Sequence, residues 1–124
     1  MWSLCAAAFA APTGSPQAQQ TNVRQQYVYV LHLTSRLHDK SAWTEAENKA
    51  VGQHFARLAK ATEGGQVTLA GRTTESLDKA FGLVVFEAES EEAAKLLMES
   101  DPAVIAGVMT ATLDPYSVAL LRKP

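Results

Sequence analysis

The sequence predicts one α+β domain in which strands and helices follow each other in the order βαββαβ. The length of 124 residues suits a single domain with one core. Two segments, 26–34 and 81–88, are rich in β-branched and aromatic residues, as strands are. Two others, 44–62 and 90–99, begin with residues that cap helices. This order is the split βαβ, or ferredoxin-like, arrangement, an antiparallel sheet with both helices on one face.

Both expected helices carry start signals. Thr44 and Glu47 stand at capping-box spacing at the beginning of the first helix, and Ser90 precedes the second. The spacing of apolar residues predicts the side chains that the helices bury, namely Val51, Phe55 and Leu58 in the first and Ala93, Leu96 and Leu97 in the second.

The remaining strands are expected around a polar loop and a proline. Residues 67–72 and 81–88 form a predicted pair of strands joined by the loop 73–79. The last strand, 108–121, is interrupted at Asp114-Pro115, where proline removes a donor from the hydrogen-bond ladder. We therefore expect a bulge or a sheet edge at that point.

The strands 26–34 and 81–88 are apolar on both of their alternating faces. Such strands are covered on both sides in folded proteins. Two helices can cover only one face of the sheet, and no further segment is left to cover the other. We therefore expect a homodimer packed through the sheet faces, and the alternative is a monomer with an apolar ligand groove there.

Residues 1–20 differ from the rest of the chain because they carry no charged side chain. An apolar run at 4–11 contains a small-residue pattern that fits signal-peptide cleavage. We expect residues 1–25 to be a signal-like, disordered segment, 26–124 to be the domain, and the location to be secreted or periplasmic. No Lys or Arg precedes the apolar run, so a misassigned start or a disordered tail, with a cytoplasmic location, is the alternative.

Composition excludes several classes of function. The net charge is −2 and the basic residues are scattered, so no nucleic-acid partner is expected. No apolar run approaches the ~20 residues that a membrane span needs. A single cysteine allows neither an internal disulfide nor a cysteine-based zinc site. His32, His38 and Asp39 have no recognised ligand spacing, and no phosphate-binding glycine loop is present, so we expect neither a metal nor a cofactor.

His54 is the strongest candidate for chemistry. Helical spacing places it about 60° from the centre of the buried face. A histidine there is partly desolvated and still reachable by a ligand, as a general base must be. The alternative is a boundary residue that bonds a carbonyl. Asp101 before Pro102 is a favoured helix start, so capping is its simplest interpretation, although a capping carboxylate also retains lone pairs for a histidine N–H.

Three further residues are candidates for contact with a substrate. Arg57, one turn after His54, and Arg72, at the end of the second strand, could bind an anionic group, although such residues are more often solvated or paired. Tyr29 could steady an oxyanion, although a core or dimer-face aromatic is the simpler interpretation.

Three short motifs together resemble the YciI-like (YCII-related) family, and the resemblance covers about residues 26 to 121. The motifs are HFARL at 54–58, VTLAG at 67–71, and ESDP at 99–102 before Gly107-Val108. The resemblance implies a dimer of the dimeric α+β barrel type. It also implies a His–Asp pair in an active site near the dimer interface, at His54 and Asp101 here.

The resemblance also implies a class of reaction. One member type of the family is a dehydrochlorinase of aromatic degradation, and the fold neighbour muconolactone isomerase moves protons on a ring-derived lactone. We therefore expect a lyase or isomerase in which Asp101 accepts one N–H of His54 and the other ring nitrogen takes a proton from a small organic molecule. The alternatives are a non-catalytic dimeric module that binds such a molecule, and heme binding as in other dimeric α+β barrels.

Overall fold

A computed structural model describes residues 24–124. Residues 1–23 of the signal-like segment predicted at 1–25, and the location inferred from it, lie outside these described residues, and Gln25 is already part of the first strand. The sheet contains β1 (Gln25–Leu33), β2 (Val67–Arg72), β3 (Phe81–Ala88) and β4 (Met109–Pro115). The helices are α2 (Glu45–Glu63), α3 (Glu91–Glu99) and the short α4 (Pro102–Ile105), and the 3-10 turns η1 (Ser35–His38) and η2 (Lys40–Ala42) precede α2.

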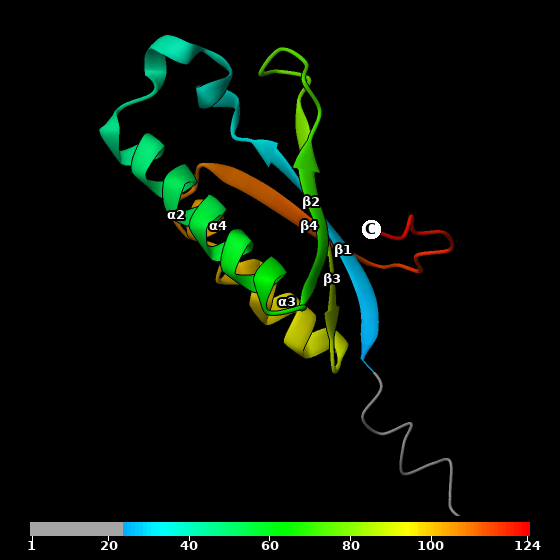
Figure 1. Ribbon diagram of the computed structural model, residues 1–124. Helices are drawn as coiled ribbons and strands as arrows, with labels where there is room; N and C mark the ends of the chain where they lie inside the picture. The colour runs from blue at the N-terminus through cyan, green and yellow to red at the C-terminus, as the bar shows by residue number, and fades with distance from the viewer. Residues whose placement is uncertain (1–23) are drawn as a thin grey trace, which may run out of the picture.

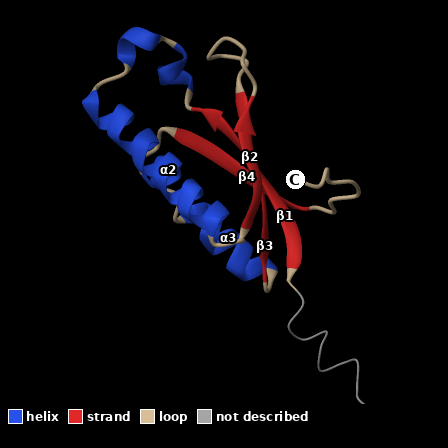
Figure 2. Cartoon of the chain, viewed as in Figure 1, coloured by secondary structure: helices blue, strands red, loops and turns tan. Residues whose placement is uncertain are grey.

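The four strands form one antiparallel sheet in the order β2-β3-β1-β4. All three α-helices lie on the same side of this sheet, with the turns η1 and η2 at one end (Figure 1 and Figure 2). The predicted ferredoxin-like α+β fold is therefore confirmed. Among the described helices, none is both long and apolar enough to cross a membrane.

The core lies between the sheet and the helices. Tyr27, Tyr29 and Leu31 alternate along β1 and are buried on the side that carries the helices, together with Val84 and Phe86 of β3. The rings of Tyr29 and Phe86 meet edge to face, with centroids 5.6 Å apart. Burial of each such side chain contributes about 1.5–3 kcal/mol. This packing fixes β1 below the helices and positions Tyr29 for the site described below.

The predicted helix starts are present. Thr44 and Glu47 form the capping box of α2, in which each side chain bonds a backbone N–H of the first turn. Ser90 caps α3, and Asp101 caps α4 by accepting the N–H of Ala103. Gly107, with a φ of 75°, follows the end of α4 in a conformation that glycine adopts without strain.

The prediction of the buried helix faces was partly wrong. In α2 the buried side chains are Ala50 and Leu58, whereas Phe55 is 72% exposed. In α3 the buried side chains are Ala94 and Met98, not Ala93 and Leu96. Spacing within one helix leaves its rotation free by about one residue, or 100°. Contact with the sheet decides the rotation, and Ala94 and Met98 are the α3 side chains that belong to the buried core.

The last strand is shorter than predicted. It ends at Pro115, and the N–H of Tyr116 donates to the carbonyl of Gln26 instead of continuing a ladder. The C-terminal segment then lies on the side of the sheet away from the helices (Figure 1). On this side Val85 of β3 is buried, whereas Leu69 and Leu83 are 53% and 37% exposed. Within residues 24–124, the second sheet face is therefore only partly covered.

Candidate active site

His54 and Asp101 are brought together by the packing of α2 against α4. They lie 47 residues apart in the sequence, yet Nδ1 of His54 is 2.8 Å from both Oδ1 and Oδ2 of Asp101. Asp101 reaches the histidine because it is the first residue before α4 and its side chain turns back over the helix start. The two candidate residues of highest interest are thus direct partners.

Asp101 is the one charged side chain within residues 24–124 that is fully buried. Its carboxylate accepts hydrogen bonds from the hydroxyl of Tyr29 at 2.8 Å and from the N–H of Ala103 at 2.9 Å, in addition to His54. Burial raises the pKa of Asp101, but the hydrogen bonds from His54 and Tyr29, followed by the charge of His54, outweigh it. The pKa therefore lies below its ordinary value, and the carboxylate is ionised.

Tyr29 is fully buried in β1, and its hydroxyl is committed to Asp101. Burial first, and the negative charge of Asp101 second, raise the pKa of Tyr29 far above its usual range. The phenol therefore stays protonated and serves as a donor. Tyr29 does not line the cleft described below, so it does not occupy the place expected for a residue that contacts a substrate.

The hydrogen bonds of His54 determine which ring nitrogen is available. Because Nδ1 faces a carboxylate, the neutral ring carries its proton on Nδ1, and Nε2 has a free lone pair. Nε2 has no hydrogen-bond partner within the described part of the chain and is not among its enclosed unpaired atoms. The side chain is 12% exposed. This is the arrangement of a general base whose second nitrogen is held in place.

His54, whose Nε2 is open, lines a cleft of about 790 Å³. Typical small-molecule sites measure roughly 300–1,000 Å³. The cleft lies between α2 on one side and β2, β3 and their connecting loop on the other. Most of its lining is aliphatic or aromatic, and its only ionisable residues in the described chain are His54 and Arg72. Large apolar side chains of the lining include Leu33, Trp43, Val51, Phe55, Leu77 and Met109.

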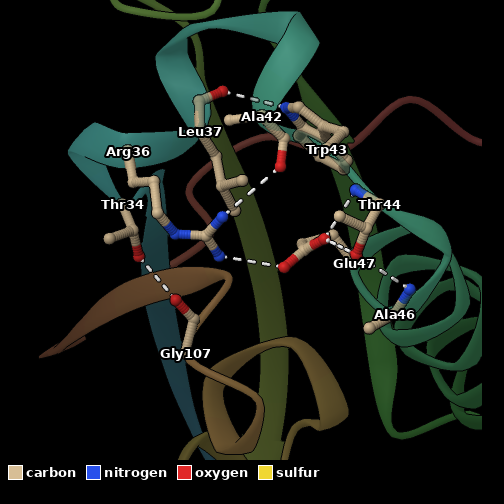
Figure 3. A network of polar contacts seen from close by, with 9 residues as sticks. All are labelled: Thr34, Arg36, Leu37, Ala42, Trp43, Thr44, Ala46, Glu47 and Gly107. Carbon is tan, nitrogen blue, oxygen red and sulfur yellow. Dashed lines mark hydrogen bonds and ion pairs between the residues drawn. The ribbon is translucent and has the colours of Figure 1, made fainter.

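A polar network holds the segment around η1 and η2, and Trp43 of this segment lines the cleft (Figure 3). Arg36 bonds Glu47 at 2.9 Å, so the first turn of α2 is tied to η1. The indole N–H of Trp43 donates to the carbonyl of Leu37 at 2.9 Å. The indole N–H of Trp43 therefore has its hydrogen-bond partner within the protein, and Trp43 lines the cleft.

The two candidate arginines lie in different places. Arg72, at the end of β2, is exposed and lines the cleft with His54. Arg57 is directed instead to the start of α4, where Nη2 donates to Oγ of Ser100 at 3.2 Å. It is not among the cleft residues, so the structure does not bring it to a substrate.

The histidines outside the pair do not gather into a metal site. Nε2 of His38 lies 3.2 Å from the carbonyl oxygen of Leu33, and Asp39 caps η2 through Ser41. Over residues 24–124, no group of three His, Cys, Asp or Glu side chains is placed to hold a metal ion.

Sequence analysis missed Trp43 and Leu77 as parts of the cleft. The available signal was a large apolar side chain in each of two polar segments, 35–44 and 73–79.

Comparison with known proteins identifies the family to which the chain belongs. No curated protein matches the chain. Among solved structures, the chain is similar to 5-chloro-2-hydroxyhydroquinone dehydrochlorinase (TftG) from Burkholderia phenoliruptrix AC1100, in complex with 2,5-dihydroxybenzoquinone. The TM-score is 0.51 at 16% identity, over 74% of this chain and 93% of that one, which shows a shared fold. The YCII-related domain matches residues 28–113, a range that includes His54 and Asp101, and the chain therefore belongs to the YCII-related domain family.

Proposed function

We propose that the protein is a small-molecule enzyme in which His54 transfers a proton, in a reaction of lyase or isomerase type. The proposal rests on the position of the imidazole between a buried carboxylate and an apolar cleft. One nitrogen is held by a fully buried carboxylate, and the residue lines an apolar cleft of small-molecule size.

In the proposed reaction, Nε2 of His54 takes a proton from an acidic carbon or hydroxyl of the substrate. The negative charge of Asp101 stabilises the imidazolium that forms, and Tyr29 and Ala103 hold the carboxylate in position. The electrons of the broken bond then form a double bond. A leaving group departs from the neighbouring carbon in an elimination, and His54 returns the proton to another carbon in an isomerisation.

The relative of similar fold supports this reaction class, because its name describes removal of hydrogen and chloride from a hydroxylated ring. The side chains that line the cleft here also fit proton transfer better than acyl transfer. Among the described residues that line it there is neither a cysteine nor a serine, and the only hydroxyl group is that of Thr62.

A ligand-binding module without catalysis is the second candidate, and the apolar lining of the cleft favours it. Turnover separates the two. The probes are 5-chloro-2-hydroxyhydroquinone, followed by chloride release, and unsaturated five-membered lactones, followed by deuterium uptake from D2O. We expect turnover with one of them, and His54→Gln should lower it by about 10²–10⁴-fold. His38→Gln, which changes an exposed histidine, is the matched control.

Turnover that His54→Gln leaves unchanged would contradict the proposal. Binding of a probe by both proteins without turnover by either would favour the binding module. Circular dichroism and thermal unfolding of each variant separate a loss of chemistry from a loss of fold.

We also propose that a second copy of the chain covers the open sheet face. Leu69 and Leu83 are exposed there beside a shallow hollow of about 270 Å³ that both line. The C-terminal segment on the same side exposes Leu120 and Leu121 as well. Light scattering after gel filtration should give twice the monomer mass, and Leu83→Lys should give the monomer. Leu96→Lys, on the exposed side of α3, should leave the dimer intact, and a wild-type monomer would overturn this proposal.

A further inference from the structure

We propose that the cleft selects a planar, largely apolar molecule with a single anionic group, and that Arg72 is the residue that binds this group. The inference rests on the proposed function, because the reacting atom of such a molecule would lie at His54. It concerns the class of substrate, which the His54–Asp101 pair by itself leaves open.

The charge of the cleft is the first argument. Nineteen of the described residues line it, and none of these is Asp, Glu or Lys. The ion pairs among residues 24–124 are Arg36–Glu47 and His54–Asp101, so the guanidinium of Arg72 has no acidic partner there. A fixed positive charge beside an apolar surface favours an anionic ligand and disfavours a cationic one.

The strand register is the second argument. Arg72 pairs with Gly82, which lies two residues before Val84 on β3. Because alternate residues of a strand share a face, the side chain of Arg72 starts from the side of the sheet that carries α2. Ala70, two residues earlier, and Gly82 are the small residues beside it. A Cβ at position 82 would lie 3.3 Å from the carbonyl oxygen of Gly71, tighter than most contacts, and glycine avoids this contact.

The other residues that line the cleft determine the shape and polarity of the uncharged part of the ligand. His54 and Phe55 line the cleft from α2, and Leu77 lines it from the loop between β2 and β3. The N–H of Trp43 is already bonded to Leu37, so its ring offers an apolar surface. Aromatic side chains pack well against planar rings. A flat ring therefore fits between these surfaces.

The number of anionic groups follows from the number of cations. One guanidinium matches one carboxylate with two parallel hydrogen bonds. A dicarboxylate would place a second charge against apolar side chains without a partner, which is costly. The cleft therefore fits a monoanion.

The test compares benzoate with benzamide, which have nearly the same shape and differ in charge. Binding is followed by NMR on the indole N–H of Trp43, in a Trp2→Phe background that leaves this residue as the only tryptophan. We expect benzoate to bind more tightly than benzamide. Arg72→Gln should weaken the affinity for benzoate about 10- to 100-fold and leave the affinity for benzamide unchanged. Arg72→Lys, which keeps the charge, should restore part of the difference, and Arg122→Gln in the exposed C-terminal segment is the control.

Equal affinity for the two probes in the wild-type protein would overturn the inference, as would a benzoate preference that survives Arg72→Gln. Failure of benzoate to shift the Trp43 signal up to its solubility limit would overturn it as well. None of these measurements depends on turnover. If His54→Gln fails to change turnover but the dependence on Arg72 is found, the proposed reaction is wrong and the anion selectivity stands.

Discussion

Two kinds of helix start occur in the described part of this molecule, and they differ in what the capping side chain contacts. Thr44 and Ser90 cap α2 and α3 at the surface, where both are exposed and bond groups of their own first turn. Asp101 caps α4 in the same way, but it is fully buried and accepts two further hydrogen bonds, from Tyr29 and His54. Capping a helix requires only the hydrogen bond to a backbone N–H of the first turn, and not the further bonds from Tyr29 and His54.

The difference shows what the extra bonds cost and what they produce. A buried carboxylate is expensive unless it is well paired, and a serine or threonine would cap α4 without that cost. The additional partners of Asp101 are a histidine on α2 and a phenol on β1, so its charge acts on a residue that lines a cleft. The caps of α2 and α3 serve the stability of a helix, whereas the cap of α4 also orients an imidazole.

The strongest test of this comparison is Asp101→Ala. The substitution removes the cap and leaves three donors without an acceptor, on Tyr29, His54 and Ala103. We expect the free energy of unfolding to fall by about 3–5 kcal/mol, because one partner of a buried pair is lost. Urea unfolding measures this change, and a loss no larger than that of a surface cap would contradict the comparison.

Asp101→Asn keeps the shape and the cap but removes the charge. At neutral pH we expect a loss of about 1–3 kcal/mol, since an amide supplies one oxygen where the carboxylate supplies two. The folded-state pKa of Asp101 lies below its ordinary value near 3.9, so the stabilisation by the carboxylate is present above that pH and is lost as the pH falls through the folded-state pKa. Unfolding curves of the two proteins should therefore converge in acid, and a difference independent of pH would show that the charge is not responsible.

Tyr29→Phe isolates one of the extra bonds. The ring and its packing on Phe86 remain, and the hydroxyl that donates to Asp101 is removed. We expect a loss of about 1–3 kcal/mol, in the range for hydrogen bonds to a charged group. Tyr27→Phe is the matched control, because the hydroxyl of Tyr27 bonds only Gln25 near the strand end. Equal losses of unfolding free energy in the two variants would show that the bond to Asp101 contributes no more to stability than the bond to Gln25.

Ser90→Ala gives the smallest expected effect. It removes one hydrogen bond to the N–H of Ala93 at the surface, and such caps contribute typically about 1 kcal/mol. Turnover or ligand binding in the cleft should not change. A change in either would mean that the cap of α3 is coupled to the site, which the comparison does not predict.

The fold was largely predictable because its signals are local. Strand composition, the capping box at Thr44 and Glu47, and the start at Asp101-Pro102 each depend on a few adjacent residues. The rotation of the helices was not predictable in the same way. Packing on the sheet selects Ala94 over Ala93, and Phe55 is left at a cleft that spacing along one helix does not reveal.

The candidate site was predictable only in part. Helical spacing marked His54 as a boundary residue and Asp101 as a cap, and the family resemblance joined them as a pair. Their contact spans 47 residues and depends on how α4 packs against α2, which no local pattern encodes. The role of Tyr29 had no local signal either, because its hydroxyl finds its partner across the core.

The tautomer of His54 shows whether Asp101 orients the imidazole. Nitrogen NMR of the imidazole, at a pH where the ring is neutral, distinguishes a proton on Nδ1 from one on Nε2. We predict the Nδ1–H form in the wild-type protein, with Nε2 free at the cleft, and a shift toward the Nε2–H form in Asp101→Asn. A wild-type ring protonated on Nε2, or one that Asp101→Asn leaves unchanged, would contradict this prediction.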